Sequence, residues 1–337
     1  MGVQMEWSAM AAAKPRFAMC HASTILPRDD GSVLCAFFAG SAEGAADTGI
    51  WMCTVKDGQG SEPVLVASGS EAHWNPVLFT YPDGAIGLIY KVGNVIASWR
   101  SYVCRSEDGG MSFSKPRELV PGERGGRGPV RNQPIVLKRG RAGRYLCPAS
   151  LEDGEWRAFC DISDDGMQTL HKSAEVRLSR EDLEKTQAAE HVIPLSSQSF
   201  SGRGVIQPAL FEDQGGVHML LRSSAGWIFR SDSDDFGESW SVPYSIGIPN
   251  NNSGLSCAVL DGTLYLACNP VAGNFGRRTP ITLFSSQDGR SFRKEADMDS
   301  ADAEFSYPCV TASGGALYVS YTYMRKNIRV IKYKQTK

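Results

Sequence analysis

The chain has 337 residues, of which 42% are hydrophobic, and a formal net charge of −2. That length can bury the core of one large domain or of two small ones. The charges nearly balance and are spread evenly, so no field attracts nucleic acid or an anionic membrane. No run of about 18 apolar residues predicts a transmembrane helix. We therefore expect neither nucleic acid nor a membrane as a partner.

Nine cysteines are scattered along the chain without a C-x-x-C pair. Their spacing indicates neither a metal site nor a disulfide framework. Most of them lie in apolar runs, where cysteine serves as a small hydrophobic side chain. The N-terminal segment lacks the basic start and apolar core of a signal peptide. We expect no metal or other cofactor, and a reducing, cytoplasmic location.

Short runs rich in Val, Ile, Leu, Tyr and Phe alternate with turns that contain Gly and Pro, a pattern typical of β-strands. Six units repeat the order of polar residues, a strand, a tight turn and a second strand. They begin near residues 20, 73, 131, 206, 252 and 306. Intervals of about 45–75 residues are typical of the four-stranded blades of a propeller. We predict an all-β, six-bladed β-propeller, with one helix at 179–189.

The last unit contains only three predicted strands, at 305–312, 316–323 and 327–334. A ring of blades must pair its free edge strands. We therefore predict that a strand from the N-terminal segment, around Met5 to Phe17, completes the final blade. The whole chain, 1–337, would then form a single domain.

A second repeat has the form S-x-D-x-G-x-S-aromatic, at Ser106–Phe113 and Ser233–Trp240. Ser163–Leu170 is a degraded copy and Ser286–Phe292 is one residue shorter. The pattern looks like the Asp-box, a turn between the third and fourth strands of a blade. In such a turn the carboxylate accepts hydrogen bonds from turn amides, and glycine adopts a positive φ. We interpret these boxes as structural and not catalytic.

Because the first strand of each blade lines the central channel, equivalent positions on six first strands converge at one mouth. These positions carry His21, Asn75, Asn132, Gln207, Asn252 and Tyr307, with His73 and Arg131 beside two of them. Each asparagine either ties blades together or contacts a ligand. For His21 and Tyr307 we favour ligand contact.

Charged residues in the loops belong near the same mouth. The small-residue loop within 37–51 carries Glu43 and Asp47, Arg222 follows the second strand of unit four, and Arg277 and Arg278 precede the third strand of unit five. Two arginines from different blades near one axis suit a carboxylate, because their planar guanidinium groups bind it with two hydrogen bonds.

With these motifs the chain resembles the sialidase superfamily, within the group of BNR-repeat proteins. The resemblance implies six blades, three arginines that hold a sugar carboxylate, a nucleophilic tyrosine polarised by a glutamate, and an acid/base residue in a first-blade loop. It matches Arg222 and Arg278 to the second and third arginines, with Arg277 as a rival to Arg278. Tyr307 matches the nucleophile, and Glu43 the loop acid, with Asp47 in reserve.

Two positions depart from that family pattern. Cys20-His21-Ala22-Ser23 replaces the motif that carries the first arginine, and Gln207 stands near the place of the polarising glutamate. Without that base, a phenol with a pKa of about 10 is a poor nucleophile at neutral pH. His21 could serve as the base instead.

Three hypotheses follow for the function. The preferred one is a glycoside hydrolase acting on a terminal acidic sugar, either sialic-acid-like or a uronate. The second is a polysaccharide lyase on a uronate-containing glycan, in which His21 or His73 abstracts a proton and Tyr307 protonates the leaving oxygen. The third is a non-catalytic glycan-binding propeller with tryptophans that stack on sugars: Trp51, Trp74, Trp99 and Trp156.

Overall fold

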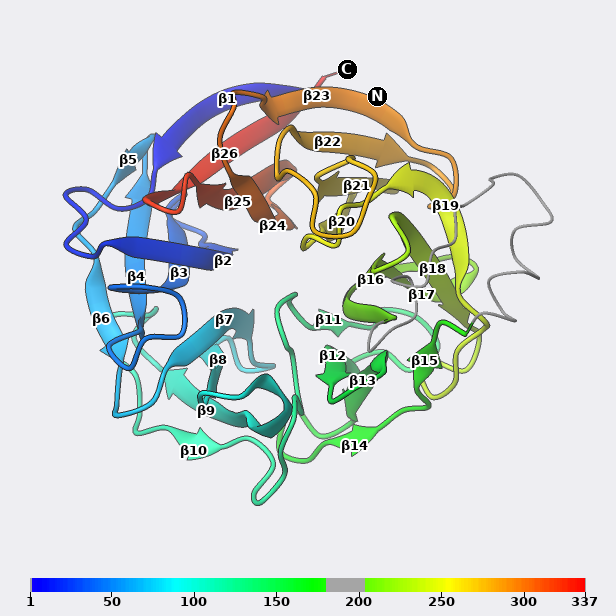
Figure 1. The fold of residues 1–337 in the computed structure, drawn as a ribbon, viewed down its shortest axis with the longest axis horizontal. Coiled ribbons are helices and arrows are strands. Elements are labelled where there is room, and N and C mark those ends of the chain that lie inside the picture. Colours follow the sequence, from blue (N-terminus) through cyan, green and yellow to red (C-terminus); the bar gives the residue numbers. More distant parts are fainter. Residues whose placement is uncertain (1, 180–203, 337) are drawn as a thin grey trace.

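The computed structural model describes residues 2–179 and 204–336. Six antiparallel sheets stand in a ring around a central axis (Figure 1). The all-β, six-bladed propeller predicted from the sequence is confirmed. One short 3-10 turn, η1 (Ile96–Ser98), interrupts the β-structure in blade two.

Each blade is a sheet whose strands follow one another from the channel outward. Blade one contains β2 (Met19–Pro27), β3 (Val33–Gly40), β4 (Gly49–Lys56) and β5 (Gln59–Gly60), with β6 (Val64–Ala67) also paired to β4. Blade two contains β7 (His73–Thr80), β8 (Ile86–Val92), β9 (Arg100–Ser106) and β10 (Arg117–Glu118). Blade three contains β11 (Ile135–Val136), β12 (Tyr145–Glu152), β13 (Trp156–Ser163) and β14 (His171–Lys172), with β15 (Val176–Arg177) also paired to β13.

The other three blades follow the same order. Blade four contains β16 (Val205–Asp213), β17 (Gly216–Ser223), β18 (Trp227–Ser233) and β19 (Tyr244–Pro249). Blade five contains β20 (Ser256–Leu260), β21 (Thr263–Cys268), β22 (Ile281–Ser286) and β23 (Arg293–Asp299). Blade six contains β24 (Phe305–Ser313), β25 (Ala316–Tyr323), β26 (Asn327–Thr336) and β1 (Gly2–Met10).

The N-terminal strand closes the ring. β1 runs antiparallel to β26, with Gly2 opposite Thr336 and Met10 opposite Arg329. The two ends of the chain therefore lie side by side at the rim of blade six (Figure 1). The strand was expected within 5–17, and it starts earlier and ends at Met10. Pairing the first strand with the last gives blade six its fourth strand and joins the two ends of the chain in one sheet.

Hydrophobic side chains fill the space between neighbouring blades. In the described residues they form six clusters, one for each pair of adjacent blades. The nine cysteines are free and buried. Several of them pack within these clusters, including Cys20 and Cys309 between blades six and one. As the sequence predicts, they act as small apolar residues.

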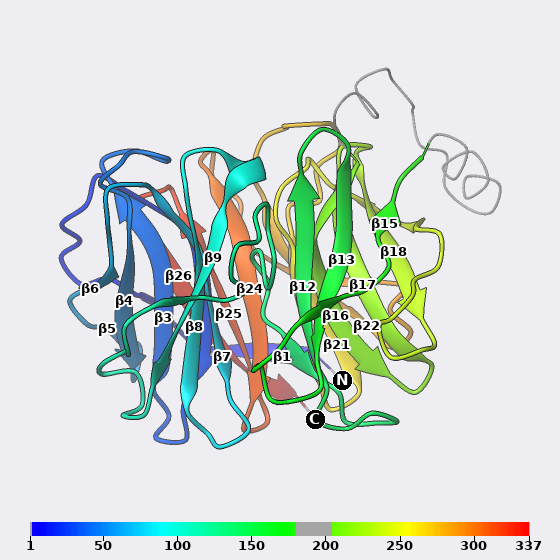
Figure 2. The ribbon, with the colours of Figure 1, turned by 90° about the horizontal axis from the view of Figure 1, so that it is seen from below.

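The Asp-box turns lie where the sequence places them, between the third and fourth strands. In the first box, Asp108 accepts hydrogen bonds from the Ser106 hydroxyl at 2.7 Å and the Ser112 amide at 2.9 Å. Asp235 does the same in the blade-four box, with Ser233 and Ser239. Ser106 pairs with Ile86, at the end of blade two remote from His73. The boxes therefore lie on the face opposite the amino-terminal ends of the inner strands (Figure 2).

The helix predicted at 179–189 lies, apart from Ser179, outside the described residues. Within 2–179 and 204–336, no helix is long and apolar enough to cross a membrane. The extent of the domain, 1–337, stays a prediction.

Candidate functional site

The inner strands share a backbone feature that aims side chains at the channel mouth. Their pairing with the second strand shifts register after His21, Trp74, Ile206 and Ser306. In each case the next residue has a positive φ, as does Asn252 just before β20. A bulge of this kind bends the strand and redirects a side chain, and such strained positions cluster at functional sites. The residues concerned are Ala22, Asn75, Gln207, Asn252 and Tyr307.

This repeat corrects the sequence-based alignment of the six units. In blade one the bulged residue is Ala22, so His21 precedes the equivalent position by one residue. In blade three the inner strand is reduced to two residues, and Asn132 lies in the segment that leads to it. His21 and Asn132 therefore do not occupy the place that Gln207 and Tyr307 occupy.

Arg222 on β17 hydrogen-bonds to positive-φ residues of three blades. Its Nε donates to Asn252 Oδ1 at 2.9 Å, and its Nη1 donates to Gln207 Oε1 at 3.0 Å and to the Tyr307 hydroxyl oxygen at 2.9 Å. The side chain is 4% exposed. Gln207 thus holds Arg222, and it is Arg222 that hydrogen-bonds to the Tyr307 hydroxyl. Arg222 was predicted at this mouth, and the structure places it against Tyr307.

Three arginines surround the ring of Tyr307. The guanidinium carbons of Arg131, Arg278 and Arg222 lie 5.0, 5.3 and 5.9 Å from its centroid. Burial by itself would raise the pKa of this phenol, but the positive charges of Arg222, Arg278 and Arg131 outweigh it and lower the pKa below the ordinary value. A tyrosine in this field has more phenolate character than one in water.

Arg131 reaches Tyr307 from a segment that crosses the channel. Its guanidinium donates to the carbonyl oxygens of Leu255, at 3.1 Å, and Pro308. It is buried, which lowers its pKa to about 10. A Cβ at Gly254 would lie 2.9 Å from Arg131 Nε and 3.3 Å from the Tyr307 ring, so only glycine fits there. Arg131 is therefore held by backbone carbonyls against the ring of Tyr307, and we interpret it as a positioning residue.

The neighbours of Arg131 fasten the same segment to other blades. Asn132 donates to the carbonyl oxygens of Gln207 at 3.2 Å and Pro208 at 2.9 Å. Gln133 donates to those of Ile25 and Leu78, in blades one and two. Asn132, proposed as a substrate contact, is thus occupied as a structural tie.

His21 packs against Tyr307 at a distance of 4.2 Å between ring centroids. Its Nδ1 lies 2.9 Å from the Thr322 hydroxyl, and the side chain is 1% exposed. Burial, followed by the charges of Arg325 and Arg278, holds the pKa of His21 well below its usual range, so the imidazole is neutral. The expected proximity to Tyr307 is thus present, as a contact between two rings tilted by 46°.

Glu152 also belongs to this cluster and was not predicted from the sequence. It ends β12 opposite Trp156, whose ring lies 5.9 Å from the Arg222 guanidinium. Its charge acts on Tyr307. Burial raises the pKa of Glu152, against the effect of Arg222. Glu152 ends the second strand of unit three, close to the place of Arg222 in unit four, so the repeat itself contained the signal.

A chain of alternating charges forms the rim of the mouth. Glu304 accepts from Arg278 Nη1 at 2.9 Å and from Arg325 Nε at 2.9 Å. Arg325 also pairs with Glu43. Burial would raise the pKa of Glu304, but Arg325 and Arg278 lower it on balance. Arg325 and Glu304 were not predicted, because their neighbours come from the first, fifth and sixth blades.

The remaining predicted residues divide between the mouth and other places. Arg277 lies outside the cluster, in an exposed ion pair with Asp302. Asp47 accepts from the Ser41 hydroxyl at 2.8 Å and holds its own loop together. His73 faces a groove between blades one and two. Asn75 is 5% exposed, and none of the described residues hydrogen-bonds to its amide.

Trp156 is the tryptophan that reaches the arginine cluster. Trp74 and Trp99 pack on each other at 5.3 Å, and both donate to the Gly93 carbonyl. Trp51 donates to the Ala39 carbonyl at 3.2 Å. In residues 2–179 and 204–336, no three His, Cys, Asp or Glu side chains gather closely enough to hold a metal ion.

Six four-stranded blades, Asp-box turns and a central tyrosine among arginines define the class of sialidase-like β-propellers. The chain belongs to the BNR repeat-like domain family, whose pattern matches residues 31–319. No curated protein matches it.

Solved structures share the fold at low sequence identity. A protein of unknown function from Dyadobacter fermentans DSM 18053 superposes with a TM-score of 0.76 at 16% identity, covering 99% of this chain and 100% of the other. A Hadza microbial sialidase gives 0.73 at 14%, covering 94% of this chain and 66% of the other. The Trypanosoma rangeli sialidase in complex with the inhibitor DANA gives 0.70 at 14%, covering 98% and 58%.

Proposed function

We propose that this protein is a sialidase-like glycoside hydrolase that removes a terminal acidic sugar, sialic-acid-like or a uronate, from a glycan. The observation that carries the proposal is the position of Tyr307 within the field of Arg131, Arg222 and Arg278. A packed core has no need for three guanidinium groups around one phenol, because burying each of them is costly. A site that receives an anion does need them.

Arg278 and Arg222 would contribute to substrate binding in different ways. Arg278 has a partly exposed side chain and, among the described residues, forms an ion pair with Glu304 alone. It is therefore placed to receive a carboxylate from solvent. Arg222 lies deeper and donates to Tyr307, so its charge stabilises the phenolate. The carboxylate of the sugar would therefore meet Arg278 first, with Arg222 deeper in the site beside Tyr307.

Two ionisable groups beside each other are shifted in opposite directions, as an acid and a nucleophile require. The pKa of Tyr307 is lowered and that of Glu152 is raised. In the proposed reaction the Tyr307 oxygen attacks the anomeric carbon, the glycosidic C–O bond breaks, and a carboxylic acid gives its proton to the leaving oxygen. Water then hydrolyses the tyrosyl intermediate. Glu152 and Glu43 are the candidate acids.

A uronate lyase is the second candidate, and the contact between neutral His21 and Tyr307 favours it. A neutral imidazole is able to accept the proton beside a carboxylate, while a phenol protonates the leaving oxygen. The two reactions differ in their products, because elimination creates a carbon–carbon double bond that absorbs ultraviolet light and hydrolysis does not.

The test is a panel of fluorogenic glycosides carrying sialic acid, glucuronate or galacturonate, with the neutral glucoside and galactoside as controls. Uronate polysaccharides are followed in parallel by ultraviolet absorbance. We expect dye release from at least one acidic glycoside and none from the neutral ones. Absorbance without dye release would favour the lyase, and no turnover of any acidic sugar would overturn both.

The two candidate acids can be separated by the leaving group. Glu152→Gln should slow hydrolysis of a substrate with an alkyl leaving group by about 10²–10⁴-fold, because the departing oxygen then lacks a proton donor. With an activated aryl leaving group, which departs without a proton, the same variant should be nearly as fast as the parent. Glu43→Gln is the matched control. If Glu43→Gln shows the leaving-group dependence and Glu152→Gln does not, the assignment to Glu152 is wrong.

A further inference from the structure

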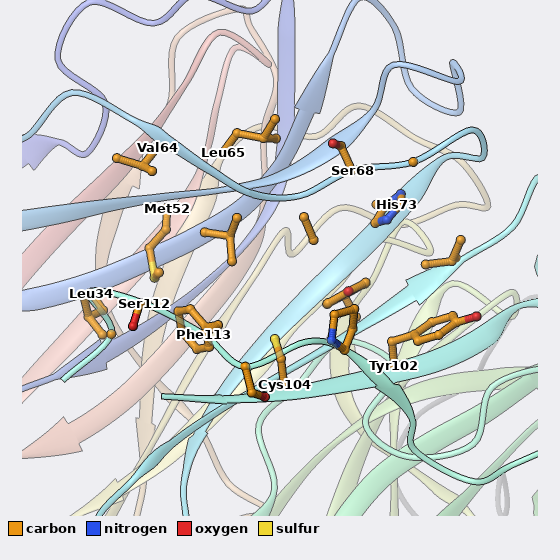
Figure 3. Close-up of a pocket in the computed structure, with 18 of the residues that line it drawn as sticks. Leu34, Met52, Val64, Leu65, Ser68, His73, Tyr102, Cys104, Ser112 and Phe113 are labelled. Carbon is orange, nitrogen blue, oxygen red and sulfur yellow. The ribbon is translucent and has the colours of Figure 1, made fainter. Parts of the chain in front are cut away.

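A groove of about 870 Å³ separates blade one from blade two, away from Tyr307. One wall comes from β4 and β6 of blade one, and the other from β8, β9 and the turn after β9 in blade two. Figure 3 shows its side chains. The residues that surround Tyr307 do not line it, so it is a separate site.

One end of the groove is apolar. Leu34 and Met52 from blade one face Phe113 from blade two, and Val64 and Leu65 lie along the edge (Figure 3). Val64 is 65% exposed and Leu65 is 45% exposed. Side chains of this size normally lie inside a core, and a group of them around a concavity is typical of a binding surface.

The other end is polar but carries no net charge. His73, Tyr90 and Tyr102 stand in a row on three neighbouring strands, with ring centroids 5.5 and 6.1 Å apart. Among the described residues that line the groove, Arg100 and Glu71 form an ion pair with each other. Arg28 lines it as well, donates to the Gly109 carbonyl at 2.9 Å and lies 3.8 Å from Asp30. His73 and Tyr102 lie at the opposite end of the groove from Leu34 and Met52 (Figure 3).

Two largely buried side chains at this end each present a polar atom that has no hydrogen-bond partner among the described residues. His73 Nδ1 donates to the Glu71 carbonyl at 2.9 Å, which leaves Nε2 as an unused acceptor, and the side chain is 5% exposed. Tyr90 is 2% exposed, and no hydrogen bond joins its hydroxyl to any described residue. Burial lowers the pKa of His73, so the ring is neutral. An unpaired acceptor and an unpaired hydroxyl on a groove wall call for a ligand that supplies hydroxyl groups.

We propose that this groove binds an uncharged amphiphile, a molecule with an alkyl or aryl tail and a hydroxylated head group. The tail lies between Leu34, Met52 and Phe113, and the head hydrogen-bonds to His73 Nε2 and the Tyr90 hydroxyl. A wholly apolar occupant would leave both polar atoms desolvated and unpaired. A charged head would find Arg100 and Glu71 already neutralised by each other.

The test is calorimetric titration of the full-length protein with octyl glucoside, below the concentration at which it forms micelles. We expect saturable binding of one molecule per chain. Methyl glucoside, which lacks the tail, and octyl sulfate, which has a charged head, should each bind at least about ten-fold more weakly. Equal binding of methyl glucoside or of octyl sulfate would overturn the proposal.

Substitutions of groove residues test whether octyl glucoside binds in the groove. Leu65→Asp should weaken octyl glucoside binding by about ten-fold or more, because it sets a charge against the tail. Tyr90→Phe, which keeps the ring stack, should weaken it several-fold by removing the hydroxyl. Val242→Asp, an exposed residue of blade four, is the control and should bind like the parent.

Two outcomes with Leu65→Asp would contradict the proposal. Parent-like binding by Leu65→Asp would place the amphiphile elsewhere. If sedimentation shows a dimer that Leu65→Asp disperses, a second copy of the chain is the occupant. Turnover at the mouth is measured alongside, and it should be unchanged in all three variants because the two sites share no residue.

Discussion

Replacing Tyr307 with phenylalanine should lower kcat on the best acidic substrate by about a thousand-fold or more. The variant keeps the aromatic ring that packs against His21 and lies within reach of Arg131 and Arg278. It loses only the oxygen to which Arg222 donates. A nucleophile that is missing cannot be replaced by the surrounding charge, so the loss should fall on kcat and much less on substrate binding.

The control for this substitution is Tyr318→Phe. Tyr318 lies in the same blade, on β25, and packs on Trp7 at 6.5 Å, far along the strand from the mouth. It should retain full turnover. Thermal unfolding of both variants should resemble that of the parent. If Tyr307→Phe retains more than about a tenth of the parent activity, Tyr307 is not the nucleophile, and a lyase or a binding role for the propeller gains support.

Arg278→Met should reduce kcat/KM for an acidic substrate by about 30–100-fold, the effect of losing a charge-assisted hydrogen bond to a carboxylate. The adjacent Arg277→Met should leave it unchanged. These neighbours differ in what they face: Arg278 lies over Tyr307, whereas Arg277 pairs with Asp302 at the surface. The comparison therefore separates a specific contact from general positive potential.

The pH dependence of Arg278→Met provides a second measurement. The charge of Arg278 helps to lower the pKa of Tyr307. Without it that pKa rises, so the phenolate forms at higher pH and the ascending limb of the pH–rate profile should move to higher pH. A profile at the parent position would show that Tyr307 ionisation does not limit the rate. Equal losses for the two arginine variants would mean that neither contacts the carboxylate.

The candidate site was only partly predictable from the sequence. Arg222, Arg278 and Tyr307 were found because each stands at a recognisable place in a repeated unit. Glu43 was found as a loop acid, but its ion pair with Arg325 was not. His73 was assigned to the mouth by its nearness to Asn75. Strict alternation would place His73 and Asn75 on one face, but the bulge at Asn75 breaks the alternation, and His73 lines the groove between the blades.

The sequence by itself determined the number of blades, the order of their strands and the Asp-box turns. These features depend on local alternation of apolar residues and on turns whose hydrogen bonds are made within a few residues. It also determined that the last blade needs an extra strand, because a three-stranded unit leaves an edge unpaired.

Only the tertiary structure decided which side chains meet at the mouth. Arg131 reaches Tyr307 from the segment before β11, Glu152 comes from the end of β12, and Arg325 comes from the turn before β26. One-residue differences in the bulges separate His21 from the place of Tyr307, and a shift of one residue reverses the face on which a strand presents its side chain. Such contacts join residues of different blades, and they exist only once the ring has closed.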